Sequence, residues 1–309
     1  MNRQLKSSLI LMLTAIIWGL AFVAQSKGSA YTGSCTFIGV RFLVASAVML
    51  PAILISDGMA RRKGGDAETK SNKGIWRAGI ICGVLLFSAS LAQQEGITLG
   101  TGAGKAGFIT AIYIVTVPII NLLLFRKKTS AAIWLGVVLA LGGLYLLCMN
   151  GAETLLVSDL LVLACAIIFS FQILSVDRFS PRYDAMKLAT IQFLTCGVLG
   201  TILMIPFDII PVGFATWASN LIQPEAWISI AYAAVFSSAV GYTLQIVGQR
   251  GLNPAIASLI MSMECAFAVL AGWLILGQRM TPRELVGSAL IFVAIIIAQI
   301  PAKTKVKEQ

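Results

Sequence analysis

Residues 11–22 read LMLTAIIWGLAF, and residues 162–173, which lie 151 positions later, read VLACAIIFSFQI. The same offset aligns further identical residues in the two halves without a gap. These pairs are Phe42 and Phe193, Trp76 and Trp227, Gln94 and Gln245, Ala106 and Ala257, and Gly136 and Gly287. One constant offset over this length predicts an internal duplication. The alternative is chance similarity between two segments that are both rich in leucine, isoleucine and alanine.

The composition is that of a membrane protein. Hydrophobic residues make up 58% of the chain and charged residues 12%, whereas about 25% of the residues in a soluble domain are charged. Apolar runs of about 20 residues, the length a helix needs to cross a bilayer, cover 8–25, 34–56, 75–94, 104–124, 131–149, 155–176, 186–207, 226–247, 253–276 and 284–301. We therefore expect an all-α integral membrane protein with ten transmembrane helices embedded in the lipid bilayer.

The duplication and the runs together predict the topology. Five spans fall in each half, and an odd number of spans forces the second copy to enter the membrane in the opposite orientation. The expected organisation is thus two inverted-topology five-helix repeats, over residues 1–151 and 152–302, followed by a cytoplasmic tail at 303–309. Inverted repeats of this kind are the architecture of many alternating-access transporters.

The formal net charge of +10 would favour a nucleic-acid partner in a soluble chain, but here its distribution has another explanation. Of the 23 basic residues, 18 fall on the side of the N-terminus in the expected topology, four fall on the other side, and Arg41 lies within the second span. The positive-inside rule then places both termini in the cytoplasm. The basic residues therefore report membrane topology, and no nucleic-acid partner is expected.

Several motifs resemble a known family. Residues 101–110 read TGAGKAGFIT and lead into YIVTVP at 113–118. In the second half, NPA at 253–255 is followed by MECAFA at 263–268 and LGQRMT at 276–281. With Ile17-Trp18-Gly19 and Arg41-Phe42, this pattern is similar to the EamA family of the drug/metabolite transporter superfamily. Members usually end the ninth span with Leu-Gly-Glu, and Gln278 replaces that glutamate here.

The resemblance implies ten spans in two inverted repeats and a central cavity between the halves. It also implies export of a small-molecule substrate, such as an amino acid or an amine, most often across a bacterial inner membrane. The alternatives are a passive channel or facilitator and a structural membrane subunit. An enzyme is disfavoured because the chain has no histidine, no common hydrolase motif and no phosphate-binding loop. No cofactor and no metal are expected. The sequence does not indicate the oligomeric state.

Glu264 is the strongest candidate for the transport site. It lies eleven residues after Asn253, at a depth of about 16 Å by the rise of an α-helix, which is close to the bilayer midplane. The repeat offset places Tyr113 opposite it. A carboxyl group in such surroundings suits an amine group or a proton, because low polarity favours its neutral form and makes proton exchange feasible. The alternative is a carboxyl group that only joins helices.

Glutamines and aromatic residues supply further candidates. Amides are costly in lipid, so Gln94 and Gln245, which are equivalent in the repeat, are expected to face a shared cavity. Other polar and aromatic candidates are Gln25 for the pathway, and Gln172, Trp18, Phe22, Phe169 and Tyr242 for the substrate. Aromatic walls suit apolar parts of a solute, although aromatic residues on helices more often serve packing.

Three residues are candidates for gating or for the pathway. Arg41 either binds a substrate carboxylate or, more often for such a residue, extends to the outer headgroups or joins helix ends. Lys105 is expected to form an external gate with Glu95 or to remain a solvated interfacial lysine. Pro118 leaves the carbonyl group of Ile114 without a helical donor, which allows either a bend during gating or a static kink.

Overall fold

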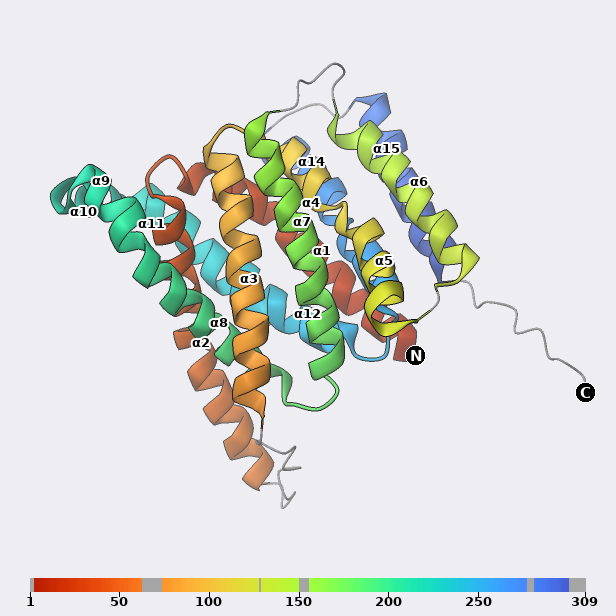
Figure 1. The fold of residues 1–309 in the computed structure, drawn as a ribbon, viewed down its shortest axis with the longest axis horizontal. Helices are drawn as coiled ribbons and strands as arrows, with labels where there is room; N and C mark the ends of the chain where they lie inside the picture. Colours follow the sequence, from red (N-terminus) through yellow and green to blue (C-terminus); the bar gives the residue numbers. More distant parts are fainter. Residues whose placement is uncertain (1–2, 63–73, 128, 150–155, 277–280, 300–309) are drawn as a thin grey trace, which may run out of the picture.

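The computed structural model describes residues 3–62, 74–127, 129–149, 156–276 and 281–299, and in these ranges all regular secondary structure is helical (Figure 1). The expected repeat boundary at 151 and 152, Gln278 and the tail at 303–309 lie outside the described residues. Eight helical segments in the described ranges are long and apolar enough to cross a membrane, and Pro254–Leu270 is a shorter apolar helical segment. The protein is therefore a multi-pass, all-helical membrane protein.

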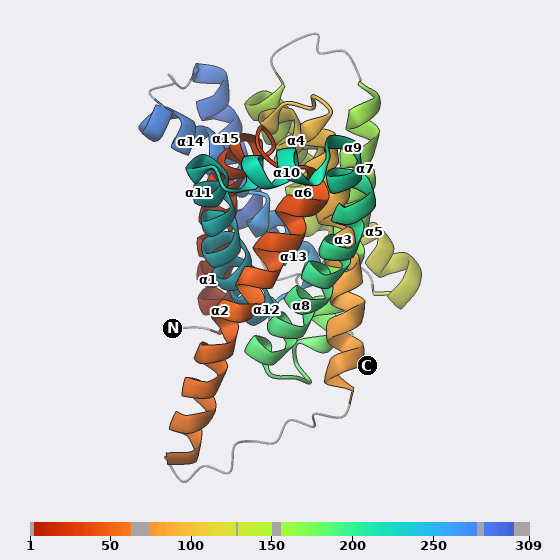
Figure 2. The same ribbon diagram turned by 90° about the vertical axis from the view of Figure 1, so that its left-hand side faces the viewer.

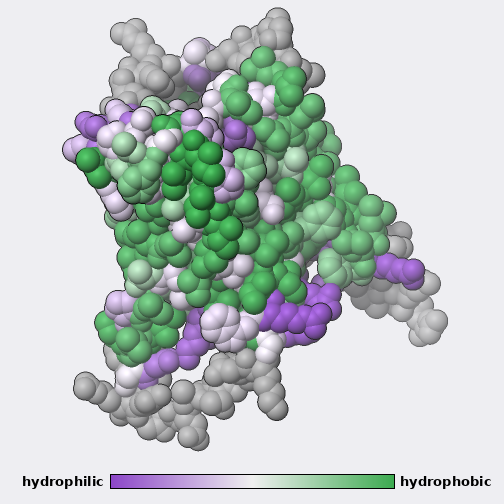
Figure 3. All heavy atoms as spheres, turned by 60° about the vertical axis from the view of Figure 1, so that its left-hand side comes forward, coloured by the Kyte–Doolittle hydropathy of each residue, from purple (hydrophilic) through white to green (hydrophobic). Residues whose placement is uncertain are grey.

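The helices of the first half pack mainly against helices of the second half (Figures 1 and 2). They are α1 (Arg3–Gly28), α2 (Ser34–Arg62), α3 (Ile75–Thr98), α4 (Ala103–Thr110), α5 (Tyr113–Phe125) and α6 (Ala131–Cys148). Apolar side chains cover the middle of the molecule, and hydrophilic ones gather toward its two ends (Figure 3). This distribution matches a lipid environment around the middle of the bundle.

The second half contains two π-helical segments. Its elements are α7 (Val157–Phe179), α8 (Ala185–Met204), η1 (Ile205–Ile209), α9 (Ile210–Val212), α10 (Phe214–Leu221), α11 (Pro224–Tyr232), η2 (Ala233–Tyr242), α12 (Thr243–Gln249), α13 (Pro254–Met261), α14 (Glu264–Leu276) and α15 (Pro282–Ala298). One apolar span runs from Pro224 to Gln249 and passes from α11 through η2 to α12. The sequence predicts one regular α-helix over 226–247, but residues Ala233–Tyr242 within this span form π-helical turns.

Helices in the two halves begin at positions that differ by the repeat offset. The equivalent first residues are Ser34 and Ala185, Ala103 and Pro254, Tyr113 and Glu264, and Ala131 and Pro282. Local chemistry follows the same register: the hydroxyl group of Ser130 caps α6 by accepting from the amide of Ile133, and that of the equivalent Thr281 caps α15 by accepting from the amide of Glu284. The offset seen in the sequence is thus also an offset in helix boundaries.

Two expected spans, 104–124 and 253–276, are each interrupted near the middle. In the first, the amide of Ile112 donates to the carbonyl of Ile109 at 3.1 Å. In the second, the amide of the equivalent Met263 donates to the carbonyl of Ile260 at 3.2 Å. Bonds to the third preceding residue tighten the chain into one 3₁₀-like turn, which separates α4 from α5 and α13 from α14. The expectation of continuous helices is wrong at these two places.

Pro118 does not account for these interruptions. It is buried inside α5, after the break at 111–112. The equivalent position in the second half is Val269, and the span there is interrupted in the same way. The break is therefore a shared property of both halves and does not require a proline.

Glycine contacts bring helices of the two halves together. A Cβ atom on Gly143 of α6 would lie 2.7 Å from the carbonyl oxygen of Gly287 in α15, and one on Gly287 would lie 2.6 Å from the carbonyl oxygen of Gly143. A Cβ atom on Gly200 of α8 would lie 2.6 Å from the Cα atom of Gly39 in α2. Small residues allow such close backbone approach in membrane bundles, and larger side chains at these positions would separate the helices.

Candidate functional site

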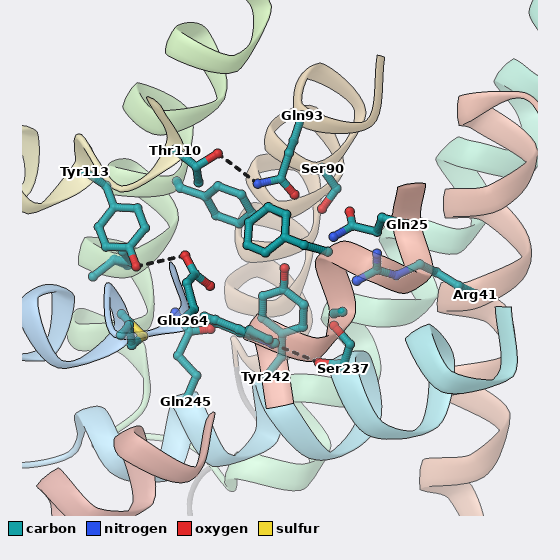
Figure 4. Close-up of a pocket in the computed structure, with 16 residues that line it drawn as sticks. Gln25, Arg41, Ser90, Gln93, Thr110, Tyr113, Ser237, Tyr242, Gln245 and Glu264 are labelled. Carbon is teal, nitrogen blue, oxygen red and sulfur yellow. Dashed lines mark hydrogen bonds between the residues drawn. The ribbon is translucent and has the colours of Figure 1, made fainter. Parts of the chain in front are cut away.

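A cavity lies in the middle of the bundle, where the two interrupted helices meet α1, α2, α3, α7, η2 and α12 (Figure 4). Its polar lining residues are Gln25, Arg41, Ser90, Gln93, Thr110, Tyr113, Ser237, Tyr242, Gln245 and Glu264. The cavity has about 40 Å³ of room for water-sized molecules, within about 520 Å³ of space between atoms. That room corresponds to about three water molecules, so a solute of several heavy atoms requires the cavity to widen.

Glu264 and Tyr113 meet at the centre of this cavity. The hydroxyl group of Tyr113 donates to Oε1 of Glu264 at 3.2 Å, across 151 residues of sequence. Each is the first residue of a half-helix, α5 or α14, so both half-helices start at the contact. Glu264 is 5% exposed and Tyr113 3%. A carboxyl group at a helix N-terminus is favoured by the helix dipole, and the backbone break therefore helps to accommodate a charge at this depth.

Arg41 lines the cavity and does not extend to the membrane surface, so the interpretation that it reaches the outer headgroups is wrong. It is 3% exposed, and its Nε atom donates to the hydroxyl group of Ser238 at 3.1 Å. Its guanidinium carbon lies 4.6 Å from the ring centroid of Phe42 and 5.9 Å from that of Phe37. Aromatic faces stabilise a cation that has been removed from water, which explains how α2 holds this group inside the bundle.

The π-helical segment η2 supplies polar groups that sequence reasoning missed. The indole nitrogen of Trp18 donates to the carbonyl oxygen of Ser237 at 3.0 Å, and Ser238 is the acceptor for Arg41. π-Helical turns inside α-helices are frequent at functional sites. Composition gives no signal for such a turn, because Ser237 and Ser238 also fit an ordinary α-helix.

Aromatic side chains form one wall of the cavity. The rings of Trp18 and Tyr242 lie 4.7 Å apart, and that of Tyr242 lies 6.1 Å from Phe42. Phe22 and Phe169 also line the cavity. All four aromatic residues expected near the substrate therefore line this cavity, and Tyr242 lies between Arg41 and Glu264 (Figure 4).

The cavity glutamine on α3 is Gln93, not Gln94. Gln93 lines the cavity and donates to the hydroxyl group of Thr110 at 3.0 Å. Gln94 instead donates to the backbone carbonyl of Gln25 at 3.4 Å and links α3 to α1. Successive residues point about 100° apart on a helix, so an error of one residue changes which glutamine faces the cavity. Gln25 and Gln245 both line the cavity.

Gln172 does not line the cavity and acts as a connector behind it. Its amide nitrogen donates to Gln192 at 3.3 Å, and its amide oxygen accepts from Gln245 at 3.2 Å. The chain of amides joins α12, α7 and α8 and fixes the orientation of Gln245. The amide oxygen of Gln245 is buried without a hydrogen-bond partner, so this group is available to a polar ligand.

Lys105 pairs with Asp159, and the expected pairing with Glu95 is wrong. Its Nζ atom lies 2.6 Å from Oδ2 of Asp159, with 8% and 3% of the two side chains exposed. Asp159 also accepts from the hydroxyl group of Thr101 at 2.9 Å and from the amide of Leu156 at 2.7 Å. The reason is packing: α4, which carries Lys105, contacts the first turn of α7, which carries Asp159. Lys105 and Pro118 do not line the cavity.

Comparison with known proteins shows which class of membrane protein this helical bundle belongs to. Residues 5–149 and 156–299 each match the EamA-like transporter family, so the chain belongs to that family. Among the described residues, no group of three or more cysteine, aspartate and glutamate side chains is placed to hold a metal ion.

Individual relatives are distant but cover most of the chain. An uncharacterized transporter of Archaeoglobus fulgidus is 28% identical over 96% of this chain and 87% of its own length. The threonine/homoserine exporter RhtA of Escherichia coli (strain K12) is 24% identical over 84% of this chain and 96% of its own length. A protein of known crystal structure has the same fold, with a TM-score of 0.74 over 95% of this chain and 96% of its own length at 16% identity.

Proposed function

We propose that this transporter exports a small metabolite that carries both an amine and a carboxylate group, such as an amino acid, by alternating access through the central cavity. The observation that carries the proposal is that Arg41 and Glu264, both almost fully buried, line the same cavity. Guanidinium groups bind carboxylates with paired hydrogen bonds, and a carboxylate binds an ammonium group. The aromatic wall between them suits an apolar side chain.

The similarity to RhtA supports this substrate class. That protein is named a threonine/homoserine exporter, and both of those solutes are amino acids. At 24% identity the likeness does not extend to a particular side chain. The proposal therefore rests on the amine and carboxylate groups, which all amino acids share.

Alternating access is supported by the geometry of the interrupted helices. In transporters, substrate sites form near the midplane where helices are discontinuous, at the interface of inverted repeats. Here the equivalent breaks before Tyr113 and Glu264 meet in the cavity, and we propose that movement of one half relative to the other widens it. We include in the proposal ten spans, two inverted five-helix repeats, both termini in the cytoplasm and location in a bacterial inner membrane.

A proton is the proposed coupling ion. One carboxyl group, Glu264, would bind either the proton or the amine group of the solute, and this competition would link the two fluxes. The energy of an inward proton gradient would then drive export of the solute.

Counterflow in proteoliposomes tests the proposal. Vesicles loaded with an unlabelled amino acid should accumulate the labelled form transiently and with saturation, whereas a channel gives no such stimulation from the opposite side. The matched amine without a carboxylate should be a poorer solute.

The role of Arg41 is tested in the same assay. Arg41→Gln should remove the preference for the amino acid over the matched amine. Lys27→Gln, which removes a positive charge from an exposed position of α1, serves as the control and should retain the preference. Equal preference in the wild type and in Arg41→Gln would contradict the assignment of Arg41.

A further inference from the structure

A second and roomier cavity lies between α3, α5 and α7, at the end of the molecule where α3 begins and α7 ends. It has about 550 Å³ of room for water-sized molecules. It shares no lining residue with the central cavity. The two cavities lie on either side of α7, because Ile173 lines the central one and Leu174 lines the second.

Three arginines line this second cavity: Arg77, Arg178 and Arg182. Among the described residues, none of these guanidinium groups forms an ion pair. An adjoining hollow shares Arg178 and Arg182 and adds Lys127, together with one acidic residue, Asp177. The balance of charge in the region is strongly positive, which favours an anionic ligand.

The positions of the arginines near the ends of their spans place them at the membrane surface. Arg77 is the third residue of the span that begins at Ile75, and Arg178 is the residue before the end of the span at Phe179. Arg182 follows that span. Charged side chains at span ends lie among lipid headgroups, so the anion these residues meet first is a lipid phosphate.

The remaining wall is apolar and faces outward. Leu124 is 60% exposed, and Phe125 and Phe171 are each 38% exposed, although all three line the cavity. Exposed apolar side chains in a span contact acyl chains. A soluble anion such as free phosphate would gain nothing from this wall, whereas a lipid would bury its chain along it.

We propose that this cavity binds an anionic phospholipid, with its phosphate held by Arg178 and Arg182 and an acyl chain lying along Leu124 and Phe171. Guanidinium groups form paired, charge-assisted bonds to phosphate oxygens. Basic pockets between transmembrane helices bind lipid headgroups in this way. The lipid would join α5 to α7, and α5 begins at Tyr113 in the central cavity. The inference does not depend on which solute is transported.

Native mass spectrometry tests the proposal on the full-length protein. The protein is released from micelles that contain equal amounts of phosphatidylglycerol and phosphatidylcholine with identical acyl chains. We expect the wild type to retain phosphatidylglycerol roughly tenfold better than phosphatidylcholine, since phosphatidylcholine has the same phosphate but adds a cationic choline group, which the arginines repel. Arg178→Gln and Arg182→Gln should each reduce that ratio severalfold.

Lys6→Gln is the matched control. Lys6 lies near the N-terminus, is exposed and lines neither of the two cavities that hold the arginines, so its loss should leave the ratio unchanged. Thermal unfolding in detergent identifies any variant that fails to fold. Because the cavity has three arginines, Arg77→Gln can then be tested in place of that variant.

Several outcomes would overturn the proposal. Equal retention of the two lipids by the wild type would exclude a selective headgroup site. Displacement of phosphatidylglycerol by millimolar inorganic phosphate would identify a soluble-anion site, and an equal effect of Lys6→Gln would indicate only general surface charge. Loss of transport in the arginine variants with an unchanged lipid ratio would assign the cavity to the solute pathway.

Discussion

Replacement of Glu264 by glutamine removes the carboxyl group that can ionise in the central cavity and changes the shape of the cavity very little. The amide oxygen of the new side chain can still accept from the hydroxyl group of Tyr113, which lies 3.2 Å from Oε1 of Glu264. Because the hydrogen bond persists and no cavity is created, we expect the unfolding temperature to stay within a few degrees of the wild type. Effects on transport then report the lost charge.

The expected magnitude follows from the burial of this group. Glu264 is 5% exposed, so its interaction with an ammonium group is little weakened by solvent. A hydrogen bond to a charged group contributes about 1.5–3 kcal/mol, which corresponds to about a ten- to hundredfold change in affinity. We predict that Glu264→Gln raises KM for an amine-bearing solute by this factor.

The pH dependence distinguishes a binding role from a structural one. In the wild type, protons compete with the amine for the carboxylate, so lowering the pH on the side where the solute binds should raise KM. Glu264→Gln has no titrating group at this position and should give a flat KM profile. The measurement is the initial rate of counterflow in proteoliposomes at several pH values, with the same pH on both sides.

Glu225→Gln is the control for this experiment. Glu225 is an exposed residue in the first turn of α11, so the same chemical change there should leave KM and its pH profile unaltered. Normal KM and an unchanged pH profile in Glu264→Gln would refute the reasoning and leave Glu264 with a structural role only.

Two further predictions concern the ion pair and the topology. Lys105→Met should destabilise the protein by about 1–3 kcal/mol, because the carboxylate of Asp159 loses its cation and keeps only the bonds from Thr101 and Leu156. The double variant Lys105→Met/Asp159→Leu should recover part of that loss in thermal unfolding, and a double variant less stable than the single one would contradict the argument. Single cysteines are placed at Pro181 and at Ser219, which are both exposed. The cysteine at 181 should react with a membrane-impermeant maleimide only in broken cells, and the cysteine at 219 should react in intact cells. The six native cysteines are buried and give little background, and labelling of both positions in intact cells would exclude the proposed topology.

Much of the architecture is encoded in patterns that extend over many residues. A run of about 20 apolar residues predicts a span because the bilayer imposes that length on any helix that crosses it. The offset of 151 predicts the pairing of Tyr113 with Glu264, and their contact spans the same number of residues. These predictions work because they average over long segments or compare whole halves, so no single side-chain orientation decides them.

The details of the site depend on the three-dimensional packing of the helices. The single tight turns before Tyr113 and Glu264 and the π-helical turns around Ser237 and Ser238 change the backbone without changing apolar composition. Whether Gln93 or Gln94 faces the cavity depends on a helix rotation of about 100°.

The partners of the charged side chains were also decided by packing. Lys105 meets Asp159 and not Glu95, because α4 lies against the start of α7. Arg41 stays inside the bundle because Phe42 and Ser238 surround its guanidinium group. The sequence determined which residues are buried in the membrane and which positions are equivalent. The contacts of these residues depend on how neighbouring helices pack and rotate. A long side chain pairs with the group that helix packing places within its reach.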